Sequence, residues 1–356
     1  MNILYTNFHK SDGGGHTIYI LSLLKNKEHN KFVACPPTSL LYTMLQKQGF
    51  DKLIPVEFPG KPKHYKEIIK NTLTLKKAIA KHNIDIVHTN GSNDNRMALY
   101  ASLMSGKKFK VVFTKHNAIP IKNLVSRTRL KWFNDAVIFV GDLLDYLGLD
   151  KKHPRFHVIP NGIDLEHWKR KKPVHTGEHL NLISHAGASR HKGWHHIMEA
   201  IAKLTVEEKK RLTVTMLARH EEEMEKELAE AGHICDFRFP GFFADVRPEL
   251  ENADIGFVLS YKEAYSFACK EMMAMSLPVI TSDFFILADT VEPEDGWVTA
   301  MKDADSIRKV LRQILSMSPE EINVMKNAAR KKAEARFSID GMIDKTNALY
   351  AEIMGK

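Results

Sequence analysis

The stretch Ser260-Tyr-Lys-Glu-Ala-Tyr-Ser-Phe-Ala-Cys-Lys-Glu-Met-Met-Ala-Met-Ser-Leu-Pro-Val-Ile280 places two carboxylates, Glu263 and Glu271, eight residues apart. The apolar run directly before it is typical of a buried strand, and the residues around Glu271 are typical of a helix. A strand, a turn and a helix start can bind a phosphate through free backbone N–H groups near Ser266 and Phe267. The two acids can bind the hydroxyls of a diol or a sugar ring. The spacing alone also fits two surface acids on an ordinary helix, so other parts of the chain must supply the remaining groups of a site.

Two successive series of alternating strand-like and helix-like segments predict an α/β chain with two doubly wound domains. The first series opens with a strand at 2–8, a glycine-rich turn and a helix. A charged segment at 165–178 suggests the linker between the series. Within them we expect short helices at 142–147 and 221–231, and an irregular segment at 281–299.

Composition limits the class of protein. The 356 residues are enough for two domains. No apolar run reaches the roughly 18 residues that a membrane span requires, and the first eight residues lack the pattern of a signal peptide. Three widely spaced cysteines argue against a disulfide framework. We therefore expect a protein of the reducing cytosol.

The charge is unevenly distributed. Residues 1–165 contain 25 Lys and Arg against 12 Asp and Glu, whereas residues 166–356 contain 27 against 31. The basic half suggests an anionic partner such as a phosphorylated glycolipid, a membrane surface or a nucleic acid, with solubility alone as the alternative. The basic segments 63–81 and 107–131 are candidates for docking on anionic lipid headgroups. We expect Trp132 and Phe133 to lie in the core.

A second loop supplies cations. Ser184-His-Ala-Gly-Ala-Ser-Arg-His-Lys-Gly193 is a small-residue turn with Arg190 and Lys192 before a helix, an arrangement that suits a diphosphate, although a solvated basic turn would look the same. The glycines 13–15 form a third loop that a ligand can approach closely. Their spacing is not the dinucleotide fingerprint, so we predict no nicotinamide site.

The possible metal sites in the sequence are weak. Asp303 and Asp305 precede a helix and are better explained as capping residues than as manganese ligands. His191 and His195 have zinc-like spacing but no third ligand in register. His185 and His196 are expected to be structural.

With these residues in view, the chain resembles the retaining glycosyltransferases of the GT-B type, in the large family 4, or "group 1", that has a Glu-x7-Glu motif. The likeness runs nearly from end to end. It is carried by residues 263–279 as the long motif, Val158-Ile-Pro-Asn-Gly-Ile-Asp164 as the interdomain signature, Arg190 with Lys192-Gly193 as the basic donor loop, Thr114-Lys-His116 as the histidine of the first domain, and Phe337-Ser-Ile-Asp-Gly-Met342 as the start of the last helix.

The resemblance implies an α/β fold of GT-B architecture, with two Rossmann-like domains that face each other across a cleft. Residues 1–165 would form the acceptor domain, with helix 338–356 packed back on it, and residues 166–337 the nucleotide-sugar donor domain. It implies transfer of a sugar from a nucleotide-sugar donor to a cell-surface glycan or glycolipid acceptor, without cofactor, metal or nucleic acid. The place of action would be the cytoplasm, and the basic half would allow peripheral association with the inner face of the membrane.

The resemblance also implies residue roles. Glu271 would bind the ribose, Glu263 the hydroxyls of the transferred sugar, and Arg190 with Lys192 the departing diphosphate. Retention in this family is usually assigned to same-face attack guided by the leaving phosphate, so no side-chain nucleophile is needed. The implied catalytic residues are His116, Glu263, Arg190 and Lys192. The implied donor-binding residues are Gly14, Gly15, Arg190, Lys192, Phe239, Gly241, Glu263, Tyr265, Ser266, Phe267 and Glu271, and the implied acceptor-binding residues are Gly13, His16 and Asn90.

Several positions depart from the family pattern. Ser266 and Ser276 stand where glycines are usual, Gly187 stands where an arginine is usual, and Asp283-Phe-Phe285 replaces a glycine pair. The last difference leaves the donor sugar open. A nucleotide-sugar epimerase of the same fold, and a non-catalytic binder of anionic glycans or nucleic acid, remain as alternatives.

Overall fold

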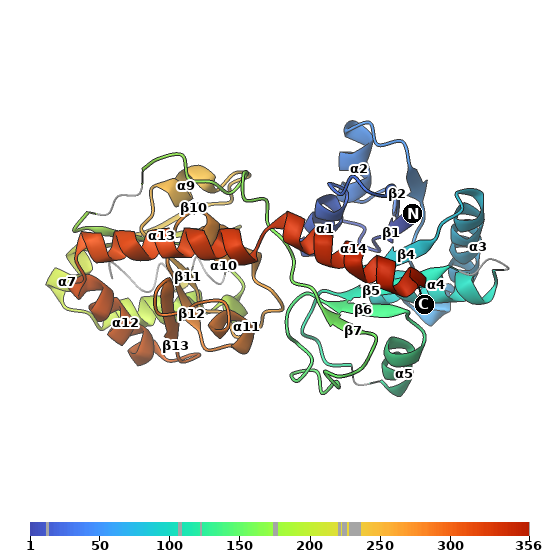
Figure 1. The fold of residues 1–356 in the computed structure, drawn as a ribbon. Coiled ribbons are helices and arrows are strands. Elements are labelled where there is room, and N and C mark those ends of the chain that lie inside the picture. The colour runs from blue at the N-terminus through green and yellow to red at the C-terminus, as the bar shows by residue number, and fades with distance from the viewer. Residues whose placement is uncertain are drawn as a thin grey trace. The chain divides into compact units, whose positions relative to one another are not determined.

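The computed structural model describes residues 1–11, 14–105, 109–121, 123–173, 177–219, 222, 226–227 and 236–355. The chain divides into two compact units (Figure 1), of which unit 1 comprises Met1–Gly162 and Ile339–Lys356 and unit 2 comprises Ile163–Ser338. Each unit is a parallel sheet with helices on its faces, as the alternation of segments predicts. Among the described residues, no helix is long and apolar enough to cross a bilayer.

Unit 1 contains a seven-stranded parallel sheet in the order β3-β2-β1-β4-β5-β6-β7. Its strands are β1 (Asn2–Thr6), β2 (Asn30–Cys35), β3 (Leu53–Pro55), β4 (Ile86–Thr89), β5 (Lys110–Lys115), β6 (Ala136–Phe139) and β7 (Phe156–Val158). Its helices are α1 (Gly15–Leu23), α2 (Leu40–Lys47), the 3-10 turn η1 (Pro62–His64), α3 (Tyr65–Lys81), α4 (Ser92–Leu103), α5 (Leu124–Trp132) and α14 (Ile339–Gly355).

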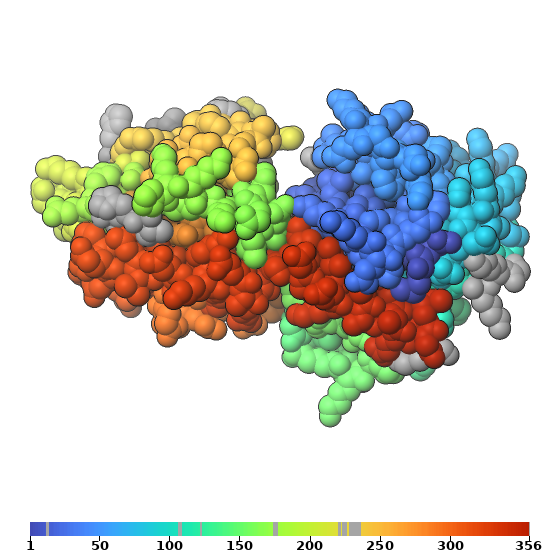
Figure 2. All heavy atoms as spheres, turned by 45° about the horizontal axis from the view of Figure 1, so that its top comes forward, coloured from blue at the N-terminus to red at the C-terminus, as the bar shows by residue number. Residues whose placement is uncertain are grey.

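The last helix completes the core of unit 1. Ile3 and Tyr5 of β1 pack in one cluster with α1 and with Met342 and Tyr350 of α14, whereas Leu4 packs on the opposite face with α3 and α4. This alternation follows from the two-residue period of a strand. Figure 2 shows the end of the chain, in red, against the blue spheres of the N-terminal segments.

Unit 2 contains a six-stranded parallel sheet in the order β10-β9-β8-β11-β12-β13. Its strands are β8 (Leu180–Ser184), β9 (Leu212–Leu217), β10 (Asp236–Gly241), β11 (Ile255–Val258), β12 (Val279–Ser282) and β13 (Gly296–Thr299). Its helices are η2 (Arg190–Lys192), α6 (Trp194–Ala202), α7 (Val206–Lys210), α9 (Arg247–Glu251), α10 (Phe267–Ala274), α11 (Phe285–Ala288), α12 (Ala304–Ser316) and α13 (Pro319–Arg336).

Three local predictions are wrong. Residues 281–299 are not irregular, because they contain α11 and β13, which pairs with β12 at the edge of the sheet. Residues 142–147 form turns and not a helix. Trp132 and Phe133 are 64% and 54% exposed, because α5 buries only Leu130. The predicted helix at 221–231 lies largely outside the described residues.

In each sheet the strand order reverses at one switch point, which lies between β1 and β4 in unit 1 and between β8 and β11 in unit 2. Ligands of open α/β sheets bind beyond the carboxyl ends of the strands at such a switch point. In unit 2 these ends lead into the loops that carry Lys192 and Glu263. In unit 1 they lead to the start of α1, which carries His16, and to the loop that carries Asn90.

Candidate functional site

In unit 2 the loops that follow β8 and β11 are joined closely. The N–H of Tyr261 donates to the carbonyl of His191 at 3.0 Å. Gly193 has a φ of 74°, and a Cβ at this position would lie 2.2 Å from the carbonyl oxygen of Leu259. Only glycine permits this approach. The glycine therefore fixes the basic loop against the end of β11.

The joined loops bring together the first acid and the lysine. Lys192 Nζ lies 2.6 Å from Glu263 Oε1, and the two side chains are 21% and 12% exposed. They come from positions 71 residues apart in the chain. This pair combines a cation that can bind a phosphate with a carboxylate that can bind hydroxyl groups, in one partly buried location.

The second acid, Glu271, has a partner that the sequence analysis assigned to structure alone. Its Oε2 lies 2.8 Å from His185 Nε2, and both side chains are nearly buried. The ring of His185 stacks on Trp168, with the ring centroids 6.1 Å apart and the planes at 23°. Among the described residues, His185 Nδ1 has no hydrogen-bond partner. The orientation of Glu271 thus depends on a histidine and on the tryptophan beneath it.

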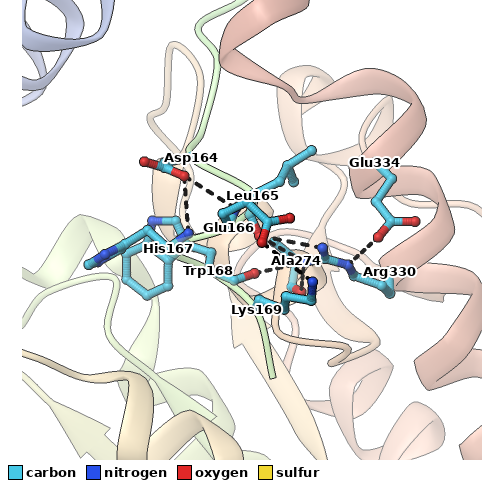
Figure 3. A network of polar contacts seen from close by, with 9 residues as sticks. All are labelled: Asp164, Leu165, Glu166, His167, Trp168, Lys169, Ala274, Arg330 and Glu334. Carbon is cyan, nitrogen blue, oxygen red and sulfur yellow. Dashed lines mark hydrogen bonds and ion pairs between the residues drawn. The ribbon is translucent and has the colours of Figure 1, made fainter. Parts of the chain in front are cut away.

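Arg330 of α13 holds that tryptophan's backbone. Its Nη1 donates to the carbonyls of Trp168 and Ala274, both at 2.8 Å, and to that of Leu165 at 3.3 Å, while its Nε donates to Glu334 at 2.7 Å (Figure 3). One guanidinium therefore joins the segment that enters unit 2 to the end of the helix that bears Glu271.

The helix α10 begins at a strained position. Ser266, its N-cap, has a φ of 60° and makes no side-chain cap, and Ser276 beyond the helix also has a φ of 60°. Both serines thus adopt the left-handed conformation that glycine would adopt freely. No side chain caps the first turn of α10, which begins at Phe267, so its N–H groups remain suited to an anion.

A buried lysine fixes the loop before α10. Lys270 is 4% exposed, and its Nζ donates to the carbonyl of Tyr265 at 2.5 Å and to Thr290 Oγ1 at 3.1 Å. It also lies over the Tyr265 ring, 4.3 Å from the centroid. Burial lowers the pKa of Lys270 to about 8. Tyr265 is therefore a buried anchor of the loop, and its contribution to any donor site runs through its backbone.

The other predicted residues of unit 2 have partners of their own within the described part of the chain. Arg190 forms an ion pair with Glu227. Phe239 packs partly buried against the core, and Gly241 ends β10 with a φ of 94° and accepts a hydrogen bond from the N–H of Ala218. Asp303 caps α12 by accepting from the N–H groups of residues 305 and 306, as the sequence predicts.

Unit 1 has a cavity of about 740 Å³ at the carboxyl ends of β1, β4 and β5. His16, Asn90 and His116, three residues nominated from the sequence, line it together with His9. The His16 and His116 rings lie 4.3 Å apart, and His9 lies 4.5 Å from His16. Burial and the charge of His9 lower the pKa of His16 to about 4, and burial with the neighbouring His16 holds the pKa of His116 well below its usual range. The imidazoles of His16 and His116 are therefore neutral at physiological pH.

The hydrogen bonds of Asn90 fix its amide. Its Nδ2 donates to the carbonyl of Thr6 at 3.0 Å, and its Oδ1 lies 3.0 Å from His116 Nε2. The neutral His116 ring therefore donates from Nε2, which leaves Nδ1 as an acceptor. Neutral imidazoles and amides are groups that bind sugar hydroxyls in a polar cavity.

The glycine loop of unit 1 is described in part. Gly14 has a φ of 48° and precedes α1, which begins at Gly15 without a side-chain cap. A Cβ at Gly14 would meet nothing within 4 Å. Gly13 lies outside the described residues.

The sequence analysis missed several residues of these sites. They are His185, Trp168 and Arg330 in unit 2, and His9 and Arg129 in unit 1. His185 lies in the quoted loop 184–193 but was expected to be structural, and the other four stand in no quoted motif. The roles of all five depend on contacts across each unit.

Comparison with family models gives two matches that follow each other along the chain. The model for glycosyltransferase family 4 matches residues 14–167, and the model for glycosyl transferases group 1 matches residues 166–332.

Individual relatives are distant. The MMP alpha-(1->4)-mannosyltransferase of Mycolicibacterium hassiacum is 26% identical over 207 residues, which cover 57% of this chain and 49% of the relative. A glycosyltransferase structure from Rickettsia africae is 18% identical with a TM-score of 0.84, over 99% of this chain and 98% of that one. The Anabaena protein Alr3699/HepE, solved in complex with UDP and glucose, is 16% identical with a TM-score of 0.81, over 99% and 100%. At these identities the structures show the fold, and they confirm the expected pair of Rossmann-like domains.

Proposed function

Because this chain belongs to the group 1 glycosyltransferases of family 4, which have the GT-B fold, we propose that it moves a sugar from a nucleoside diphosphate sugar to a cell-surface glycan or glycolipid, with retention of configuration. The observation that carries the proposal is the Lys192–Glu263 pair at the switch point of unit 2, where Lys192 comes from the loop after β8 and Glu263 from the loop before the uncapped start of α10. One structural relative supports a nucleotide donor, since the Anabaena protein HepE was solved with UDP.

Each group has a proposed task. Lys192 and the N–H groups at the start of α10 bind the diphosphate and stabilise the charge that develops on it as the sugar leaves. Arg190 adds a second cation once it exchanges Glu227 for phosphate. Glu263 binds hydroxyls of the transferred sugar, and Glu271, oriented by His185, binds the ribose. With these cations in place, transfer needs no metal, and the leaving phosphate directs attack from the same face.

In unit 1 we assign His116 to the transferred sugar, and His16 and Asn90 to the acceptor. Gly14 and Gly15 lie at an uncapped helix start like that of α10 and suit the phosphates. Phe239 and Gly241 are assigned to the base through their backbone.

A thermal-shift screen against nucleoside diphosphates and nucleotide sugars tests the donor assignment. We expect nucleotides with one particular base to raise the Tm of the full chain. The variants Lys192→Met and Glu271→Gln should lose most of that shift and of the transfer activity. The wild-type chain should keep its transfer activity in EDTA. Lys203→Met, which removes an exposed ion-paired lysine of the same unit, serves as the control. Wild-type transfer by Glu271→Gln would overturn the site assignment. Release of an epimerised sugar without acceptor would favour the epimerase, and salt-sensitive polyanion binding with no nucleotide effect would favour the non-catalytic binder.

A surface of unit 1 supports association with a membrane. A groove of about 590 Å³ between α3 and α4 is lined by exposed apolar side chains, among them Tyr65 at 57%, Ile69 at 54% and Leu103 at 77% exposure. The segment 61–81 that borders it holds seven lysines, at 61, 63, 66, 70, 76, 77 and 81, against one acid, Glu67. Apolar groups flanked by lysines are complementary to an anionic bilayer surface. We assign the groove to that surface.

Sedimentation with vesicles tests this assignment. We expect the chain to bind vesicles of phosphatidylcholine with phosphatidylglycerol and not vesicles of phosphatidylcholine alone. Leu103→Ser and Ile69→Ser should each weaken binding, while Val324→Ser, which changes an exposed apolar residue of unit 2, should not. Equal binding by all three variants would contradict the assignment. A dimer that Leu103→Ser dissociates would instead assign the groove to a second copy of the chain.

A further inference from the structure

The charged side chains that line the unit 1 cavity are all positive among the described residues. Its lining includes two cations, Lys115 and Arg129, and neither aspartate nor glutamate among the described residues. Lys115 is already satisfied, because its Nζ donates to Asn117 Oδ1 at 2.9 Å and to the carbonyl of Ile119 at 3.0 Å. The guanidinium of Arg129, by contrast, makes no hydrogen bond or ion pair with any residue that the structure describes. Of the two cations in the lining, Arg129 is thus the one whose side chain has no polar partner within the described part of the chain.

A second arginine adds to the excess of positive charge near the cavity. Arg96, on α4, directs its Nη2 to the carbonyls of Pro59 and Gly60 at 3.1 and 3.0 Å. Burial, together with the positive charge of Arg96, lowers the pKa of Arg129. A partly buried cation beside a like charge is unfavourable unless an anion compensates it.

The nearby acid compensates this charge only in part. Asp94 has its Oδ2 occupied by Thr6 Oγ1 at 2.6 Å and by the N–H of Asn90 at 2.9 Å. Burial raises the pKa of Asp94 to about 7, so this carboxyl is only partly ionised at neutral pH. The cavity therefore combines neutral hydroxyl-binding groups, at His16, Asn90 and His116, with a guanidinium whose charge the nearby acid compensates only in part.

We propose that this cavity binds an acceptor glycan bearing an anionic group, a phosphate or a carboxylate, and that Arg129 recognises that group. The inference rests on the proposed function, since it names the chemical class of the acceptor. A guanidinium can bind either anion through two parallel hydrogen bonds, and a neutral glycan would leave it unpaired. Neutral imidazoles suit the remaining sugar hydroxyls because they donate and accept without adding charge.

The test is a glycan array with matched neutral, carboxylated and phosphorylated oligosaccharides, probed with the full chain. We expect the wild-type chain to retain charged members and to bind their neutral analogues at least tenfold more weakly, since a hydrogen bond to a charged group contributes about 1.5–3 kcal/mol. Arg129→Gln should abolish the preference. Lys131→Gln removes one charge from the same helix outside the cavity lining and should keep it. The phosphorylated and carboxylated members of the array identify the anion.

Equal retention of neutral and charged glycans by the wild-type chain, or an unchanged preference in Arg129→Gln, would overturn the proposal. The nucleotide-induced Tm shift is measured on the same variants. Because Arg129 is not among the residues assigned to the donor, a normal shift without charge preference would reject the acceptor class and leave the transferase proposal intact.

Discussion

Lys192 Nζ and Glu263 Oε1 lie 2.6 Å apart, so the cation assigned to the diphosphate and the acid assigned to the sugar are partners of each other. A diphosphate must compete with Glu263 for Lys192. The pair is partly buried, so the attraction between its two charges is screened less than in an exposed ion pair.

Glu263→Gln should therefore separate binding from turnover. Removal of the competing charge should tighten binding of the nucleoside diphosphate up to about fivefold, the equivalent of ~1 kcal/mol. Transfer should fall at least about tenfold, because the glutamine binds sugar hydroxyls less strongly than the carboxylate. Calorimetric titration and initial rates measure the two effects. Glu166→Gln, which breaks an exposed lysine pair, is the control; weaker nucleotide binding by Glu263→Gln would contradict the competition.

Arg330→Met tests how the second acid is positioned. The substitution leaves the carbonyls of Trp168 and Ala274 without their donor, so we expect a loss of about 1–3 kcal/mol of stability. Because Trp168 supports His185 and His185 bonds Glu271, the KM for the donor should rise more than kcat falls. Arg336→Met, at the exposed end of the same helix, should change neither. A fall in stability with an unchanged KM would limit Arg330 to a structural role.

The outline of the fold follows from the sequence because buried parallel strands are short apolar runs. Short apolar runs, such as 255–259 in unit 2, predict the strands of both sheets. The glycine turn before α1 indicates where the first sheet has its switch point. β13 escaped prediction because Gly296–Thr299 is four residues long and follows an acidic turn. Trp132 was placed in the core from its type alone, whereas the direction that α5 faces depends on tertiary packing.

The residues of the candidate site also fall into those that the sequence predicts and those that it does not. Glu263, Glu271 and Lys192 are recognisable because they stand in motifs. Their partners are not, since His185 meets Glu271 across 86 positions and Arg330 meets Trp168 across 162. Contacts of this kind are decided by how strands and helices pack, and one sequence carries no local sign of them.

Ser266→Gly and Ser276→Gly should stabilise the chain. Each serine has a φ of 60°, and relief of ~1–2 kcal/mol of left-handed strain exceeds the ~0.5–1 kcal/mol that glycine's chain entropy costs. We expect a gain of about 0.5 kcal/mol or more at each site, read as a higher Tm. Ser260→Gly, at a buried serine with an ordinary φ, should be neutral or destabilising. A lower Tm for both left-handed variants would show that the serine side chains stabilise these turns.

Acid should destabilise unit 1 through its buried histidines. His88 is fully buried, with Nδ1 at 2.5 Å from Tyr350 Oη and Nε2 at 2.6 Å from Thr114 Oγ1, and burial lowers its pKa to about 3. The pKa values of His16, at about 4, and of His116 are also lowered, whereas an unfolded histidine titrates near 6.5. Below pH ~6.5 the unfolded chain therefore binds more protons at these sites, so stability falls as the pH falls. Asp94 acts in the opposite direction. Its pKa of about 7 means that, as the pH falls, the folded state binds a proton at this carboxyl before the unfolded state does, which stabilises the fold. This gain offsets the loss of stability from only one of the three histidines.

The Tm of the full chain should accordingly fall between pH 7 and pH 4.5, and His88→Gln should flatten this dependence. A single site of this kind contributes up to about 1.4 kcal/mol per pH unit inside its window. The variant also loses some stability at pH 7, because glutamine cannot reproduce both bonds from the imidazole, so the slope and not the Tm itself is the diagnostic quantity. His64→Gln, at a side chain that is 39% exposed, should keep the wild-type slope. An equal slope in His88→Gln and the wild type would show that the acid sensitivity arises elsewhere in the chain.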